Sequence, residues 1–127
     1  MFCCTRSRAP EVKKLAAGLG DRVAGICDAA KIFVPIQAVE IARKMAANLK
    51  ADCVVSYGGG TAVGLAKATA LEHGMPFISI VTTYSGSETT ALQGIIGRDG
   101  VRINYCDVAM LARVLIYDPE LMLNVPL

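Results

Sequence analysis

The stretch VVSYGGGTAVGLAK, residues 54–67, carries most of the information about the fold. A short apolar run ends in three consecutive glycines, and a segment rich in alanine follows. Glycine costs backbone entropy on folding, so three in a row predict a tight turn, a close approach of a ligand to bare backbone, or both. The stretch therefore predicts a buried strand, a turn and a helix in direct succession.

The same alternation of strand and helix extends on both sides of this stretch. Apolar runs predict strands at residues 1–4, 23–27, 53–57 and 77–81, and helical spacing predicts helices at residues 10–19, 36–49 and 61–72. Strands that are apolar throughout are typical of a parallel sheet with helices on both faces, because helices supply the crossovers. We expect one α/β domain with a Rossmann-like parallel sheet over residues 1–127.

The pattern changes after residue 81. A polar loop covers residues 82–90, and Asp99-Gly100 predicts a β-hairpin between strands at residues 94–97 and 101–105. A last strand is expected at residues 114–117, and Asp118-Pro119 predicts the start of another helix.

Composition limits the possible functions. The chain of 127 residues is 54% hydrophobic and 19% charged, which is typical of one globular domain. A net charge of +2 does not favour nucleic acid or an anionic membrane as a partner. No apolar run approaches the ~20 residues that span a membrane, and the N-terminus lacks a signal-peptide layout. We therefore expect a cytoplasmic protein.

The cysteines and the single histidine predict no metal site. Five cysteines with no C-x-x-C pair, and His73 alone, cannot complete the usual zinc patterns. We expect Cys27, Cys53 and Cys106 to be buried reduced thiols and His73 to lie exposed in a turn. No residue stands out as a general acid.

The three glycines predict a binding site for phosphate. In a parallel sheet, ligands bind at the carboxyl ends of the strands, and the next helix presents unpaired N–H groups there. A diphosphate fits such a turn at Gly58, Gly59 and Gly60, with a hydroxyl added by Thr61. The spacing differs from both the dinucleotide fingerprint and the Walker loop. A plain tight turn, with Gly64 for close packing, therefore remains open.

A second loop strengthens the prediction of a ligand. Thr82 and Thr83 follow the next strand, on the same edge of the sheet. Their hydroxyls, with Ser85, Gly86 and Ser87, are placed to meet the ribose or nicotinamide end of one ligand. Ordinary turn chemistry is the alternative for a loop of this composition.

Three segments then carry a resemblance to a known family. GGGTAVGLAKATAL, TTYSGSETT and LIYDPEL resemble the iron-containing alcohol dehydrogenases and, within that superfamily, the maleylacetate reductases. Gly64 stands where most of the alcohol dehydrogenases carry aspartate, and maleylacetate reductases typically have glycine there. The resemblance runs from about residue 15 to the end of the chain.

The resemblance implies a fold and an activity. It implies an N-terminal α/β domain related to the dehydroquinate synthase fold, which binds NADH or NADPH and is followed by a helical domain that supplies metal ligands. Maleylacetate reductases reduce the C=C bond of 2-maleylacetate, a dicarboxylate, to 3-oxoadipate in the degradation of aromatic compounds, and relatives are often homodimers.

The helical domain has no counterpart in this sequence. We therefore expect a truncated domain that supplies the cofactor-binding half and ends, at residues 124–127, where the linker between domains begins. Two alternatives remain open. The chain is then either an inactive remnant that at most binds a dinucleotide, or a plain α/β domain whose glycines serve packing.

The resemblance also assigns site residues. It implies that Gly58, Gly59, Gly60 and Thr61 hold the diphosphate and that Thr82, Thr83 and Ser87 line the ribose and nicotinamide side. Lys67 matches a lysine of the family, with a solvated helix residue as the alternative, and Tyr84 is a candidate for the substrate-facing edge. Arg6 stands where many relatives have aspartate, and an arginine there can pair with the 2′-phosphate of NADPH.

The resemblance finally predicts an exposed apolar surface. The face that packs on the helical domain in relatives would be uncovered here. We expect Leu121, Met122 and Leu123 to contribute to it.

Overall fold

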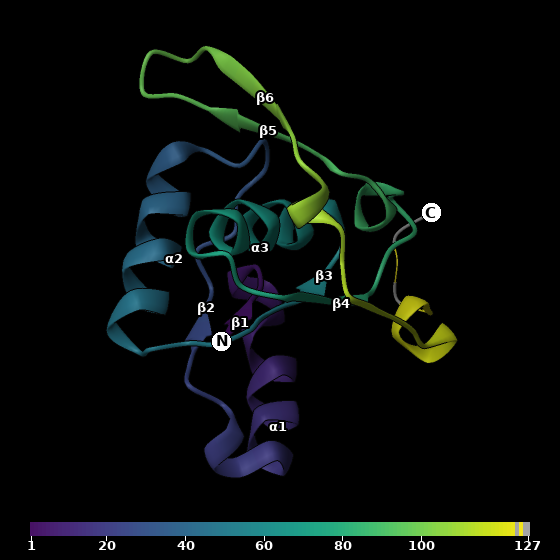
Figure 1. The fold of residues 1–127 in the computed structure, drawn as a ribbon. Helices are drawn as coiled ribbons and strands as arrows, with labels where there is room; N and C mark the ends of the chain where they lie inside the picture. Colours follow the sequence, from purple (N-terminus) through teal and green to yellow (C-terminus); the bar gives the residue numbers. More distant parts are fainter. Residues whose placement is uncertain (124, 126–127) are drawn as a thin grey trace.

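The structure, a computed structural model, describes residues 1–123 and 125. Its centre is a five-stranded sheet in which every pairing is parallel (Figure 1). The strands lie in the order β2-β1-β3-β4-β7, with bounds β1 (Phe2–Cys3), β2 (Ile26–Cys27), β3 (Val54–Gly58), β4 (Phe77–Val81) and β7 (Val114–Tyr117). The predicted α/β fold with a parallel sheet is confirmed.

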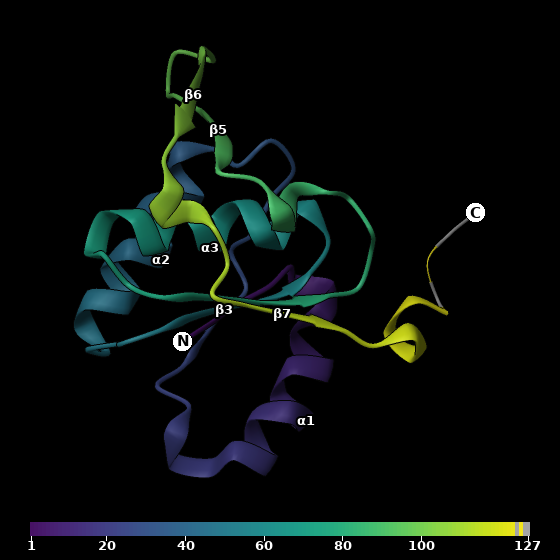
Figure 2. The same ribbon diagram turned by 45° about the vertical axis from the view of Figure 1, so that its right-hand side comes forward.

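Helices cover the two faces of the sheet unequally, and a hairpin packs on one of these helices. Helix α1 (Ala9–Leu19) lies on one face, and α2 (Ile36–Asn48) and α3 (Gly60–His73) lie on the other (Figure 2). The predicted hairpin, β5 (Leu92–Ile96) and β6 (Arg102–Cys106), packs above α3. The chain steps from β1 to β2 in one direction and then returns past β1 to β3. Right-handed crossovers therefore place α1 opposite α2 and α3.

The predicted element boundaries need small corrections. Strand β2 has two residues instead of the five expected at 23–27, and the hairpin strands are shifted by one or two residues. The helix expected after Asp118 is a short 3₁₀ turn, Pro119–Met122, and the Asp118 carboxylate caps it by accepting from the Glu120 N–H. Positions 124, 126 and 127, in the expected linker, lie outside the described residues.

Helix α3 is the centre of the larger core. Every residue from 62 to 70 is buried, because the sheet lies beneath the helix, α2 lies beside it and the hairpin lies above it (Figure 1). Its core partners include Val39 of α2, Val54 and Phe77 of the sheet, and Ile95 of the hairpin. Helix α1 covers a smaller cluster on the other face, which includes Phe2, Val12 and Tyr57.

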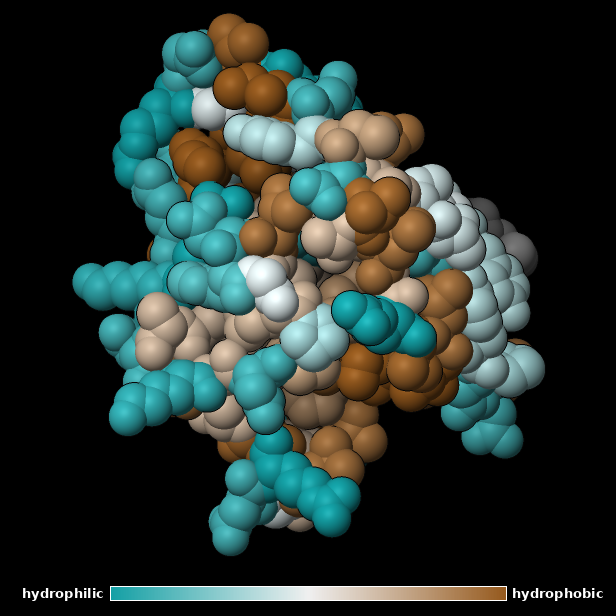
Figure 3. Space-filling model, viewed as in Figure 1, coloured by the Kyte–Doolittle hydropathy of each residue, from teal (hydrophilic) through white to brown (hydrophobic). Residues whose placement is uncertain are grey.

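Hydrophobic side chains remain exposed at β7 and on the hairpin. Val114 and Ile116 of β7 are 47% and 43% exposed, so this strand is not covered on both faces as expected. Every residue of β6 is exposed. Figure 3 shows brown surface over β7 and over the hairpin. The predicted patch at residues 121–123 is partly wrong, because Leu121 packs against the α1 cluster, whereas Leu123 is 80% exposed.

The described residues contain no helix that is both long and apolar enough to span a bilayer.

Gly64 leaves room for two other segments to reach α3. A Cβ built at Gly64 would lie 2.6 Å from Cγ2 of Val34 and 2.9 Å from the side-chain amide of Gln93. Val34 is itself buried and has a left-handed backbone, with φ of 49°. The loop before α2 and strand β5 therefore both depend on the missing side chain.

We predict that Gly64→Ala destabilises the protein whereas Gly18→Ala stabilises it. Alanine in a helix gains about 1 kcal/mol over glycine, but crowding Val34 costs about 1–3 kcal/mol. A Cβ at Gly18 in α1 meets nothing within 4 Å, so only the gain remains there. Urea unfolding of both variants measures the difference. Equal stabilisation by the two changes would show that position 64 is not crowded.

Candidate functional site

The sheet order places a topological switch point at the carboxyl ends of β1 and β3. The chain leaves β1 toward β2 and leaves β3 toward β4, so the connections after these neighbouring strands run apart. Doubly wound sheets bind ligands at such a switch point. Gly58 ends β3 at this edge, Gly59 follows it, and Gly60 begins α3. The site predicted from the glycines is thus at the place where the topology favours a ligand.

The glycines let the two predicted loops approach each other. A Cβ at Gly59 would lie 3.1 Å from Cβ of Thr83, and a Cβ at Gly60 would lie 3.4 Å from the hydroxyl oxygens of Ser85 and Ser87. The carbonyl of Gly58, whose φ is 146°, accepts a hydrogen bond of 3.1 Å from the Thr82 N–H. The loop after β3 and the loop after β4 therefore form one surface.

The first turn of α3 presents unused hydrogen-bond donors. The N–H groups of Ala62 and Val63 donate to the carbonyl of Gly59 at 3.0 and 3.1 Å. Within the described part of the chain, the N–H groups of Gly59, Gly60 and Thr61 have no acceptor. Three such donors at the positive end of a 14-residue helix match the oxygens of a diphosphate. The residues present thus fit the phosphate groups of a dinucleotide.

A cavity of about 640 Å³ adjoins this turn. Three of the predicted site residues line it: Gly60, Thr61 and Ser87. The rest of its lining comes from the loop before α2 and from the hairpin, namely Phe33, Val34, Thr90, Leu92, Gln93, Gly94, Arg102 and Asn104. The sequence reasoning missed this second group, because no local motif marks residues that only the docking of the hairpin brings to the site.

Lys67 is not placed to touch a ligand, and it is not a solvated helix residue. Its side chain is completely buried. Its ammonium donates to the carbonyl of Ser87, to the carbonyl of Thr90 at 2.7 Å and to the carbonyl of Leu92 at 3.0 Å, and it contacts the Thr90 hydroxyl at 3.1 Å. Lys67 therefore fastens the loop after β4 to α3, and its predicted direct contact with a cofactor becomes a positioning role.

Burial lowers the pKa of Lys67 to about 8, an effect that the carboxylate of Glu88 partly opposes. Glu88 is buried in the same loop and accepts hydrogen bonds from Ser85 at 3.0 Å and from Tyr117 at 3.2 Å. The loop is thus held by Lys67, which reaches it from α3, and by Glu88, which belongs to the loop itself.

The remaining predicted residues lie around the cavity without lining it. Thr82 is buried beneath the loop, and Thr83 packs against Gly59. Tyr84 is 67% exposed, and its ring centroid lies 5.6 Å from that of Tyr117. The aromatic contact favours packing as the role of Tyr84.

Arg6 lies at the same edge of the sheet, after β1. Its side chain is 91% exposed, and its Nε lies 3.8 Å from the carboxylate of Asp28. Apart from this contact, the side chain extends into solvent.

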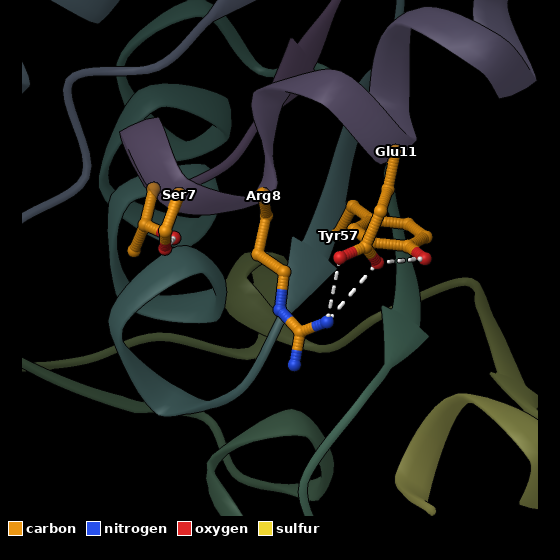
Figure 4. A network of polar contacts seen from close by, with 5 residues as sticks. Ser7, Arg8, Glu11 and Tyr57 are labelled. Carbon is orange, nitrogen blue, oxygen red and sulfur yellow. Dashed lines mark hydrogen bonds and ion pairs between the residues drawn. The ribbon is translucent and has the colours of Figure 1, made fainter. Parts of the chain in front are cut away.

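A polar network fixes α1 against the end of β3 (Figure 4). The Tyr57 hydroxyl donates to Glu11 at 2.9 Å, and the Arg8 guanidinium contacts both oxygens of the same carboxylate at 2.8 and 3.0 Å. Burial and the neighbouring carboxylate raise the pKa of Tyr57 to about 12. The phenol therefore stays protonated and holds the first turn of α1 beside the glycine turn.

The thiols and the histidine contribute nothing to the site. Cys27 is buried and Cys53 is half-buried, whereas Cys106 is exposed on β6, contrary to expectation. His73 ends α3 on the surface, as expected. Among the described residues, no three His, Cys, Asp or Glu side chains are grouped so that they could hold a metal ion. The described residues therefore do not fit the metal ion that the resemblance to iron-containing alcohol dehydrogenases implies.

Comparison with known proteins identifies the family. The chain matches the iron-containing alcohol dehydrogenases over residues 1–119, and it belongs to this family. It is 43% identical, over 123 residues, to a maleylacetate reductase of Burkholderia cepacia. The alignment covers 97% of this chain and 35% of that protein. The predicted resemblance is confirmed, and with it membership of a family of oxidoreductases.

Solved structures agree with this assignment. The crystal structure of maleylacetate reductase from Agrobacterium tumefaciens superposes with a TM-score of 0.95 at 37% identity, over 98% of this chain and 35% of that one. Sulfoacetaldehyde reductase from Bifidobacterium kashiwanohense, solved in complex with NAD+, gives a TM-score of 0.87 at 22% identity and shares the fold. The chain thus spans about a third of the length of the maleylacetate reductases that it matches.

We predict that the stabilising effect of Lys67 grows with pH. Its folded pKa of about 8 lies below the unfolded value of 10.5, so between these values the unfolded state binds more protons and unfolding becomes less favourable as pH rises. The unfolding free energy of the wild type, minus that of Lys67→Met, should increase by up to about 1.4 kcal/mol per pH unit.

Urea unfolding at pH 7.5 to 10.5 tests this, because the subtraction cancels the cysteine and tyrosine contributions. Lys44→Met, on the exposed side of α2, is the matched control for replacing a lysine with methionine. A difference that falls with pH for Lys67→Met would mean that the fold prefers the charged ammonium.

Proposed function

We propose that this chain binds NADH or NADPH at the glycine turn and supplies the cofactor-binding half of a reductase. The proposed reaction reduces the C=C bond of 2-maleylacetate to 3-oxoadipate. The observation that carries the proposal is the set of three unused N–H donors of Gly59, Gly60 and Thr61, at the positive end of α3 and beside the cavity. The substrate follows from the relatives that share 43% and 37% identity with the chain.

The residues of this chain have separate tasks in that reaction. The N–H groups hold the diphosphate. Thr83 and Ser87 lie on either side of the way from the glycine turn into the cavity and so limit where the rest of the cofactor can lie. Lys67 fixes the loop that carries Ser87. When bound, the reduced nicotinamide supplies the hydride that adds to one carbon of the double bond, and a proton completes the other carbon.

One observation favours the alternative of a binding module without activity. The described lining of the cavity contains no carboxylic acid, histidine, tyrosine, cysteine or lysine that could deliver the proton. Oxidation of NADH that depends on maleylacetate, measured with this chain alone, separates the two functions. Turnover would exclude the inactive module.

We predict that Gly59→Val weakens NADH binding at least tenfold. A branched side chain would push against Thr83 and cover the N–H groups of the turn. Titration followed by the fluorescence of bound NADH measures the affinity. Gly18→Val is the matched control, because a Cβ there meets nothing within 4 Å.

Two results of this titration would contradict the proposal. Unchanged affinity of a folded Gly59→Val variant would refute the phosphate cradle. Failure of the folded wild type to bind either NADH or NADPH would refute the proposed function as a whole.

We further predict that Arg6→Asp lowers the ratio of NADPH affinity to NADH affinity about tenfold. The change removes a cation and adds a second anion beside Asp28, and both effects repel a 2′-phosphate. Arg22→Asp is the control, because it makes the same charge change in the turn before β2, at the opposite edge of the sheet. An unchanged ratio for Arg6→Asp would end this interpretation.

A further inference from the structure

The hairpin contributes a charged side chain to the lining of the cavity. Among its described lining residues, Arg102 of β6 is the one charged side chain, and no carboxylate accompanies it. Arg102 forms no ion pair within the described part of the chain. A cavity with one cation and no anion favours a negatively charged ligand.

The hairpin is built so that Arg102 reaches the cavity. Strand β5 pairs with β6 along one side, and on its other side the Ile96 N–H donates to the carbonyl of Val34 in the loop before α2. Strand β5 therefore lies between β6 and this loop, which forms one edge of the cavity. The guanidinium crosses β5 at Gly94, where a Cβ would overlap it. Glycine at position 94 therefore opens the path for the arginine.

Asn104 fixes the direction of the guanidinium. The two side chains share one face of β6, and Nε of Arg102 donates to Oδ1 of Asn104 at 3.0 Å. The two terminal nitrogens of Arg102 have no acceptor among the described residues. A guanidinium held through Nε, with both terminal nitrogens free, presents the geometry that binds a carboxylate with two hydrogen bonds.

We infer that Arg102, oriented by Asn104 across Gly94, binds a carboxylate of a dicarboxylate substrate. This inference rests on the proposed function, since a dinucleotide whose diphosphate lies at Gly60 and Thr61 would extend into the cavity toward Arg102. The same guanidinium chemistry suits a phosphate of the cofactor. The test therefore measures the two ligands separately.

Calorimetry with the 127-residue chain tests the inference. NADH is titrated first, and 3-oxoadipate is then titrated with and without saturating NADH. Arg102→Met should weaken 3-oxoadipate binding at least tenfold and leave NADH affinity within twofold of the wild type. The 3-oxoadipate affinity of Arg102→Lys should lie between that of the wild type and that of Arg102→Met, because lysine keeps the charge but loses the fork of donors.

Two controls isolate the carboxylate contact. Dimethyl 3-oxoadipate keeps the carbon skeleton without the charges, so it should bind the wild type at least tenfold more weakly than the acid does. Its affinity for Arg102→Met should equal its affinity for the wild type. Arg98→Met removes a cation from the same hairpin, where it pairs with Glu40 outside the cavity, and should change neither affinity.

The outcomes separate this inference from the proposed function. Equal 3-oxoadipate affinity of the wild type and Arg102→Met, or no binding of 3-oxoadipate to the wild type, overturns the inference while NADH binding stands. A loss of NADH affinity in Arg102→Met, with 3-oxoadipate unaffected, overturns it in favour of a phosphate contact. Absence of NADH binding to the wild type refutes the proposed function, and the titration without NADH still tests Arg102.

Discussion

The buried ammonium of Lys67 constrains the whole candidate site. A charge removed from water needs several hydrogen-bond acceptors, and here they are the carbonyls of Ser87, Thr90 and Leu92. These carbonyls belong to the segment that runs from the end of β4 to the first residue of the hairpin. One side chain of α3 therefore fixes the loop that faces the glycine turn and sets where β5 begins. The hydrogen bonds of Lys67 therefore help to set the shape of the cavity that this loop and β5 line.

Local pattern was sufficient to predict the frame of the molecule. Apolar strands alternating with helices predicted the parallel sheet, and the glycines at residues 58–60, where β3 ends, predicted the turn at its carboxyl edge. The Asp99-Gly100 pair predicted the hairpin to within two residues. These features depend on neighbours in sequence, so the period of the pattern and the turn chemistry carry them.

The contents of the site were less predictable, because they depend on contacts between distant segments. Lys67 has the sequence context of an exposed helix residue, yet it is buried because the hairpin and its preceding loop cover α3. Arg102 is in an exposed strand with no motif, and its relation to the cavity comes from the register of β5 and β6. Sequence motifs located the phosphate end of the site, whereas tertiary packing defined the other end.

The missing side chain at Gly64 relates the width of the cavity to one position in α3. Val34 and Gln93 both reach that position, and both line the cavity. A larger residue at position 64 would push both Val34 and Gln93 away from α3. The absent side chain at position 64 therefore acts as a spacer of minimal thickness, and it sets how closely the loop before α2 and strand β5 can approach α3.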